Sequence, residues 1–178
     1  VGKSALGANT TGEYNVAVGA EAGDANTTGS LNTALGYLTL SANTTADGNT
    51  AVGGQALALN TTGAYNTSVG MDALQQNTTA SNNTADNVAV GNLALDANTT
   101  ASYGVAIGSG ALGANTTGAY NVAVGFKAIE TVTTAGENVG IGGYALRVNT
   151  TGTQNVAVGY TALDANTTAS YLTAVGYN

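Results

Sequence analysis

A five-residue pattern, Asn-Val-Ala-Val-Gly, recurs along the whole chain, with close variants between the complete copies. Complete copies span residues 15–19, 87–91, 121–125 and 155–159. The closing glycine returns every 17 residues from Gly2 to Gly176, except for one interval of 21 residues between Gly70 and Gly91. A short fixed period over an entire chain is typical of a solenoid, in which each repeat forms one coil and packs on its neighbours.

The residues before each closing glycine alternate in the manner of a β-strand. An aliphatic residue precedes the glycine, Val or Thr stands two places earlier, and a small residue separates them, as in residues 122–124. Period-two alternation of β-branched residues predicts a short strand in every repeat. We expect both faces of this strand to be buried, the valine row against a full-sized hydrophobic neighbour and the alanine row against a closely approaching backbone.

A second apolar position lies four residues after each closing glycine and holds Leu or Ile in every repeat except the one with Gly23. We interpret it as a second, shorter strand that folds back so that its Leu meets the valine row. The tripeptide Asn-Thr-Thr follows in nine repeats, as at residues 26–28, and predicts a turn. Each repeat is therefore predicted to contain a strand, a turn, a second strand and a second turn.

The repeat predicts one continuous all-β domain over residues 1–178, a parallel β-roll (β-solenoid) of about ten 17-residue coils. The longer interval corresponds to a four-residue insertion near residues 80–86, which we expect to protrude as a loop. Loops carry function more often than the scaffold that holds them, so the insertion is a candidate contact site. A ribbon this thin buries few aliphatic side chains, and we expect it to pack against identical chains.

Stacking in register aligns equivalent asparagines in two rows. The first row leads the Asn-Thr-Thr tripeptide, and the second row precedes the predicted strand. Amide side chains repeated at about 4.8 Å can hydrogen-bond to their equivalents in the coils above and below. The predicted structural ladder contains Asn9, Asn26, Asn43, Asn60, Asn98 and Asn115 from the first row and Asn15, Asn121 and Asn155 from the second.

The composition excludes several kinds of chemistry. The chain has ten acidic residues and three basic ones, Lys3, Lys127 and Arg147, which disfavours nucleic acid and anionic membrane surfaces as partners. No apolar run is long enough for membrane insertion. His and Cys are absent, so catalytic triads and the usual zinc sites are excluded, and the acids do not recur in one register as a calcium-binding roll requires. We predict no catalytic residue, no cofactor and no metal.

The repeats resemble a known family of fibrous proteins. Residues 155–163, Asn-Val-Ala-Val-Gly-Tyr-Thr-Ala-Leu, resemble the head repeats of YadA-like trimeric autotransporter adhesins, and residues 117–125 are similar to repeats of phage tail-fibre proteins. The resemblance extends over the whole chain. It implies a left-handed, homotrimeric β-roll that serves as a head or shaft. The 17-residue period is longer than that of the shorter adhesin coils, so the turns differ.

Three sets of surface residues are candidates for contact or modification. Asn-Thr-Thr is a glycosylation sequon, and Asn66, Asn77, Asn82, Asn149 and Asn166 are possible glycosylation sites. One column of rings, Tyr14, Tyr65, Tyr103, Tyr120 and Tyr171, is a possible surface contact, because amphipathic aromatics stack on sugars and proteins; Tyr37, Tyr160 and Tyr177 form another column. Paired threonines such as Thr27 and Thr28 suggest ice binding, but neighbours on a strand point to opposite faces, which argues against it.

These observations favour a non-enzymatic structural or adhesive fibre segment: an adhesin head, a tail-fibre shaft or an extracellular filament subunit. The expected partners are copies of the same chain, as a homotrimer or an end-to-end polymer, together with host or surface glycans. The expected location is extracellular, on a cell surface or in a virion fibre. A glycan- or ice-binding repeat module is the alternative.

Overall fold

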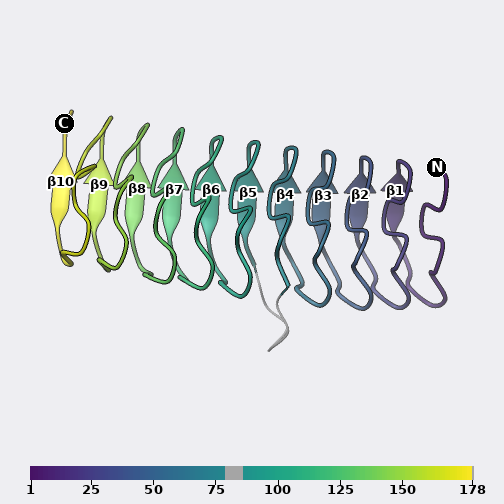
Figure 1. Cartoon of the computed structure of the whole chain (residues 1–178). Coiled ribbons are helices and arrows are strands. Elements are labelled where there is room, and N and C mark those ends of the chain that lie inside the picture. Colours follow the sequence, from purple (N-terminus) through teal and green to yellow (C-terminus); the bar gives the residue numbers. More distant parts are fainter. Residues whose placement is uncertain (79–85, 178) are drawn as a thin grey trace.

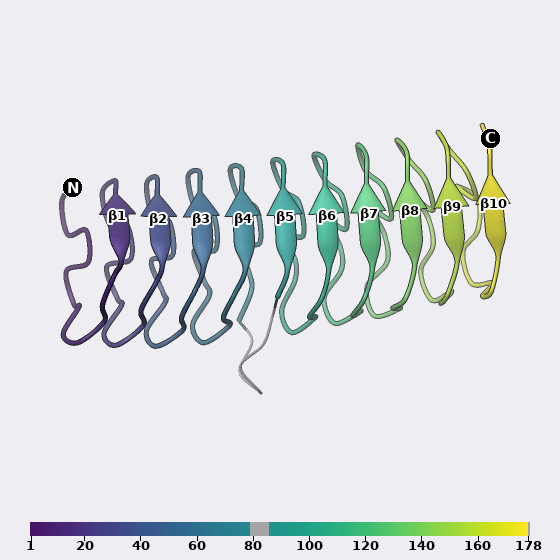
Figure 2. The ribbon, with the colours of Figure 1, turned by 180° about the vertical axis from the view of Figure 1, so that it is seen from behind.

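The computed structural model describes residues 1–78 and 86–177, and these residues form a β-solenoid without any helix (Figure 1). Ten strands pair in chain order in one parallel sheet, so that about nine turns connect them. The strands are β1 (Val16–Val18), β2 (Thr33–Leu35), β3 (Thr50–Val52), β4 (Thr67–Val69), β5 (Val88–Val90), β6 (Val105–Ile107), β7 (Val122–Val124), β8 (Val139–Ile141), β9 (Val156–Val158) and β10 (Thr173–Val175). The predicted all-β parallel solenoid is confirmed. The two termini lie at opposite ends of the stack (Figure 2).

Each strand residue pairs with its equivalent in the next coil. Val122 of β7 lies opposite Val139 of β8, 17 residues later. The register is the same across the longer interval, because Thr67 of β4 pairs with Val88 of β5. The extra residues therefore leave the sheet unchanged. The predicted protruding loop falls on residues 79–85, outside the described residues.

Every strand ends at the closing glycine because the coils touch there. Gly125 has a φ of 137°, a conformation that side chains other than glycine rarely adopt. A Cβ atom added to Gly125 would lie 2.6 Å from the carbonyl carbon and oxygen of Gly142 in the next coil. The repeat must therefore close on glycine for coils to stack at the spacing of a β-sheet.

Two consecutive turns follow the glycine, so the predicted second strand is wrong. In one coil they are closed by hydrogen bonds from Ala94 N to Gly91 O (3.2 Å) and from Asn98 N to Leu95 O (3.1 Å). Leu93 and Leu95 have φ values of 56° and 52°. Left-handed residues at every second position prevent an extended strand. The segment still bonds to its neighbours, for example from Leu95 N to Ala111 O at 3.0 Å.

The leucines pack on the alanine row, and the expected contact between leucine and valine rows is wrong. The core includes the central residues of β1–β9, alanines of the turn segments such as Ala94, and Leu40, Leu57, Leu74, Leu95, Leu112, Ile129 and Leu146, all of them buried. The site of Gly140 shows the contact directly, since a Cβ atom there would lie 2.7 Å from Ile129 Cγ1. The central position is small because Leu side chains and the backbone of the turn segment both lie against it, as the expected close backbone requires: Ser68 Oγ donates to Ala73 O at 2.8 Å, and a Cβ atom at Gly140 would lie 3.2 Å from Ala145 O. The first and third strand residues consequently face outward.

Candidate interaction surfaces

The first asparagine row forms a continuous interior ladder over much of the stack. Asn43 Nδ2 donates to Asn26 Oδ1 in the preceding coil (2.9 Å) and to Ala46 O in its own turn (3.1 Å). The same coil-to-coil bond joins Asn26 to Asn9, Asn60 to Asn43, Asn77 to Asn60, Asn98 to Asn77, and Asn166 to Asn149, at 2.7–3.1 Å. Each amide thus closes its own turn and links two coils.

The ladder is interrupted where Val132 replaces asparagine. Val132 is fully buried at the position that would otherwise hold an amide. Asn115 Nδ2 still donates to Gly118 O at 3.0 Å, but Asn115 Oδ1 is buried and has no hydrogen-bond partner. A buried acceptor left unpaired costs about 1–3 kcal/mol. Val132 is recognisable in the sequence as the exception in its column, but the unpaired oxygen of Asn115 is evident only in the structure.

The second asparagine row bonds mainly to backbone rather than to its own equivalents. Asn15 Oδ1 accepts from Asn32 N (2.9 Å), and Asn15 Nδ2 donates to Gly29 O (2.7 Å). Asn121 Nδ2 donates to Ala135 O at 2.8 Å, and Asn155 Nδ2 donates to Ala169 O at 2.9 Å. The row therefore joins the start of one strand to the turn of the next coil. The expected side-chain bonds between equivalents occur at two places, from Asn66 Nδ2 to Asn49 Oδ1 (3.1 Å) and from Asn138 Nδ2 to Asn121 Oδ1 (3.3 Å).

Burial limits access to the possible glycosylation sites. Asn66, Asn77 and Asn149 are fully buried, and the Nδ2 atom of each donates a hydrogen bond. An enzyme could glycosylate these amides only before the coils fold. Asn166 is partly exposed although its Nδ2 donates to Ala169 O at 3.1 Å. Asn82 lies outside the described residues.

Apart from the pair that begins at Thr78, which is only partly described, the paired threonines lie in bends and not on a strand, so the alternation argument does not apply to them. The first hydroxyl of several pairs bonds to the next coil, as Thr10 Oγ1 does to Thr27 O and Thr116 Oγ1 to Thr133 O, both at 2.9 Å. This hydroxyl row is already used for stacking. The pairs therefore offer a ligand few hydrogen-bonding groups other than the hydroxyls of the second threonines.

The predicted tyrosine column lies at the surface. Its rings range from 42% exposed at Tyr103 to 79% at Tyr14, so they remain accessible to a partner. Tyr103 and Tyr120 stack on each other with centroids 4.9 Å apart. Tyr65 and Tyr171 are also exposed. Other residues interrupt the column. Its rings contact each other only where two adjacent coils both carry tyrosine, as at Tyr103 and Tyr120.

A second set of rings, which we call the aromatic strip, consists of Phe126, Tyr144, Tyr160 and Tyr177. Successive centroids are 5.3, 5.8 and 5.7 Å apart. The repeat places Tyr160 and Tyr177 in one column of the sequence but predicts neither Phe126 nor Tyr144 as part of the same set. Tyr144 is the second residue after its closing glycine, whereas the other three rings each belong to the first. An alignment of the repeats therefore puts Tyr144 in a different column, although its ring lies in the same line.

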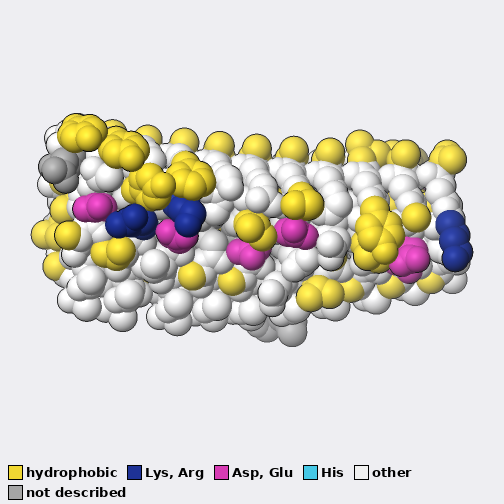
Figure 3. Space-filling view, turned by 45° about the horizontal axis from the view of Figure 1, so that its top comes forward, with side chains coloured by type: hydrophobic (Ala, Val, Ile, Leu, Met, Phe, Trp, Pro, Cys, Tyr) yellow, Lys and Arg dark blue, Asp and Glu magenta, His cyan; other side chains and the backbone are white. Residues whose placement is uncertain are grey.

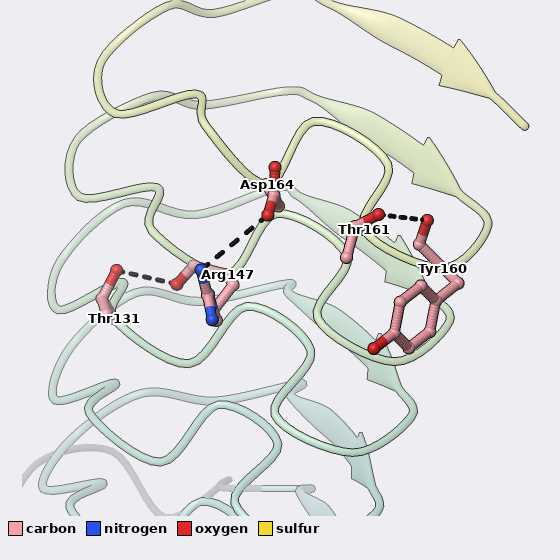
Figure 4. Close-up of polar contacts among 5 residues, drawn as sticks. All are labelled: Thr131, Arg147, Tyr160, Thr161 and Asp164. Atoms are coloured by element: carbon pink, nitrogen blue, oxygen red, sulfur yellow. Dashed lines mark hydrogen bonds and ion pairs between the residues drawn. The ribbon is translucent and has the colours of Figure 1, made fainter. Parts of the chain in front are cut away.

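Two of the three basic side chains lie over this strip. Lys127 Nζ is 5.8 Å from the Phe126 centroid and 2.8 Å from Glu130 Oε1, and the hydrogen bond with Glu130 raises the pKa of Lys127. Figure 4 shows the neighbouring pair, in which Arg147 approaches Asp164 Oδ2 at 3.8 Å. The Arg147 guanidinium lies 5.2 Å from the Tyr144 centroid. Donors and acceptors therefore alternate beside the rings.

A groove of about 580 Å³ lies next to the aromatic strip, where one coil carries two glycines between Ser109 and Ala114. Gly110 and Gly113 form its floor, with Asp96 on one side and Lys127 and Glu130 on the other. Burial is the main reason that the pKa of Asp96 is raised. Within the described residues, no cluster of three or more His, Cys, Asp or Glu side chains could hold a metal ion.

The first and third residues of β1–β10 form what we call the valine face, which runs along all ten strands. These residues are half-buried or exposed, for example Val16 at 50% and Ile107 at 40%. Four strands begin with Thr and the others with Val. Large contiguous apolar surfaces on soluble proteins usually mark an interaction site.

In comparisons with known proteins, no protein-family model, curated protein or solved structure matches the chain. Across residues 1–78 and 86–177, there is also no helix of the length and hydropathy needed to cross a bilayer.

Proposed function

We propose that this chain is a non-enzymatic structural or adhesive segment of an extracellular fibre, located on a cell surface or a virion, in which identical copies associate in parallel. The observation that carries the proposal is the valine face, an apolar surface that repeats at every coil. Identical repeating rows suit self-association, because a symmetric contact made at one coil recurs at all the others. The resemblance to adhesin heads and tail-fibre repeats supports a trimer with left-handed coils.

The chemistry of the chain agrees with a mechanical role. Backbone hydrogen bonds and buried amides link each coil to its neighbours along the stack, as the bonds from Leu95 and Asn43 illustrate. Lys and Arg together account for only three residues, so trypsin has few places to cut. No catalytic role is proposed, because the sequence lacks His and Cys.

The first test of this proposal is the mass in solution, measured by size-exclusion chromatography with light scattering. We expect about 52 kDa, three copies of the 17.3 kDa chain. Val122→Lys places a charge on the valine face and should shift the mass towards one chain, because an unpaired buried charge is costly. Leu93→Lys, at an exposed residue of a turn segment, should leave the mass unchanged.

A wild-type chain that remains monomeric at high concentration would contradict self-association. A dimer would contradict the trimer and leave the valine face as the contact. Long polymers in electron micrographs would favour end-to-end assembly. Equal dissociation by both Lys variants would show that the valine face is not the contact.

A further inference from the structure

Within residues 1–78 and 86–177, the aromatic strip is the one place where rings from four consecutive coils form an unbroken line at the surface. It appears in Figure 3 as hydrophobic side chains gathered towards the C-terminal end, beside dark blue Lys and Arg side chains. Phe126 is 46% exposed, Tyr160 is 48% and Tyr177 is 78%. These three rings therefore leave about half or more of their surface available to a ligand, whereas Tyr144 is half-buried between them.

The fold itself does not need these rings. Phe126, Tyr160 and Tyr177 each follow a closing glycine, and other coils place Ala20, Gly54 or Ser109 at the equivalent position. Those coils belong to the same sheet in the same register. The strip is therefore a local surface feature added to a scaffold that forms equally well with small residues.

The polar groups beside the strip restrict the kind of ligand. Lys127 and Arg147 supply hydrogen-bond donors, while Glu130 and Asp164 supply acceptors at 2.8 and 3.8 Å from them. Each positive charge is balanced by a neighbouring carboxylate, in a chain whose formal net charge is −7. This arrangement disfavours an anionic ligand. It suits an uncharged molecule with many hydroxyl groups, which both donate and accept hydrogen bonds.

We propose that the aromatic strip binds a linear, uncharged oligosaccharide laid along the solenoid axis. The apolar faces of pyranose rings stack on aromatic side chains, and their equatorial hydroxyls reach polar groups at the sides. The coils repeat at about 4.8 Å, and a pyranose unit in an extended chain has a similar length, so successive sugars can lie over successive coils. Tyr160 and Tyr177 are nearly parallel, at 14°, whereas Tyr144 stands at 89° to both Phe126 and Tyr160 and meets the ligand at a different angle. This inference does not depend on self-association, because no residue of the strip belongs to the valine face.

Isothermal titration calorimetry of the full chain with cellohexaose, chitohexaose and maltohexaose tests the proposal. We expect at least one of them to bind in the micromolar to millimolar range. Tyr160→Ala should weaken binding by about tenfold or more, because it removes a central stacking ring. Tyr144→Ser should have a similar effect, and Ser4 already occupies that position, with the same positive φ, in another coil.

Tyr37→Ala is the matched control. Tyr37 holds the same position after its glycine and is 57% exposed, but the adjacent coils carry Ala20 and Gly54 there, so no continuous line of rings exists. Its loss should leave the affinity unchanged. Circular dichroism of every variant should match the wild type.

Three results would overturn the proposal. The first is no heat of binding with any of the three hexasaccharides. The second is an equal loss of affinity in Tyr37→Ala and Tyr160→Ala. The third is tighter, salt-dependent binding of an oligogalacturonate, which would show that charge rather than stacking selects the ligand. None of these results bears on the oligomeric state, so the two proposals fail separately.

Discussion

At the scale of single residues, the closing glycine determines how closely the coils approach. Gly53 has a φ of 127°, and a Cβ atom there would lie 2.6 Å from Gly70 O. Its neighbour Gly54 has no atom within 4 Å of the equivalent point. Substitution of each of these adjacent glycines therefore distinguishes the stability lost through a clash between coils from the stability lost whenever a glycine is replaced.

We expect Gly53→Ala to lower the free energy of unfolding by about 3 kcal/mol, because it combines backbone strain with a clash against a carbonyl. Gly54→Ala should change it by less than about 1 kcal/mol. Thermal and urea unfolding followed by circular dichroism measures both values. Equal effects of the two substitutions would contradict the proposed role of the glycine contact.

The interrupted amide ladder gives a second residue-scale prediction. Val132→Asn should raise the free energy of unfolding by about 1 kcal/mol, because the new amide donates to the unpaired Asn115 Oδ1 and accepts from Asn149. The reverse change, Asn60→Val, removes the donor to Asn43 Oδ1 and should destabilise the chain by about 1–3 kcal/mol. Urea denaturation measures the free energy of unfolding of both variants. A loss of stability in Val132→Asn would mean that packing at this site outweighs the hydrogen bonds.

At the scale of the element, the turn segment supplies the core by pointing alternate side chains in opposite directions. Leu93 and Leu95 have nearly the same left-handed backbone, yet Leu95 is fully buried and Leu93 is 41% exposed. Backbone strain is therefore equal at the two sites. A comparison of the same substitution at both sites isolates the contribution of side-chain burial to stability.

Leu95→Ala should lower the free energy of unfolding by about 2–5 kcal/mol, because it leaves a cavity against the alanine row. Leu93→Ala should lower it by less than about 1 kcal/mol. Chemical denaturation of both variants makes the comparison. Similar losses would contradict the inward orientation of the leucine row.

At the scale of the whole molecule, the solenoid is a one-dimensional stack in which each coil contacts only its neighbours. Its pairing tolerates a 21-residue interval between β4 and β5 without a change of register. Whole coils should therefore be removable, whereas parts of a coil should not.

Deletion of residues 126–142 removes one 17-residue repeat and brings Asn149 next to Asn115, so the ladder is restored. We expect this variant to keep the β-type circular dichroism spectrum with a melting temperature close to that of the wild type. Deletion of residues 126–134 removes about half a coil and should prevent stacking beyond β7. Equal spectra for the two deletions would argue against a stack of independent coils.

The sequence by itself determined the repeat, the strand positions and the parallel register. Each 17-residue repeat ends at a glycine that follows alternating β-branched residues. Such a repeat permits few arrangements other than coils stacked so that equivalent residues lie next to one another. The two asparagine rows were visible for the same reason, because stacking places equal residues together. These conclusions depend on periodicity, which is a property of the chain alone.

Only the tertiary structure decided which strand face is inside and where the rings meet. Alternation shows that valines and alanines lie on opposite faces, but it does not say which face Leu112 packs against. The left-handed backbone of the leucines, which puts them on the alanine row, is not expected from residue type. Similarly, Tyr144 joins the aromatic strip by the direction of its side chain in space, although it occupies a different place in its repeat.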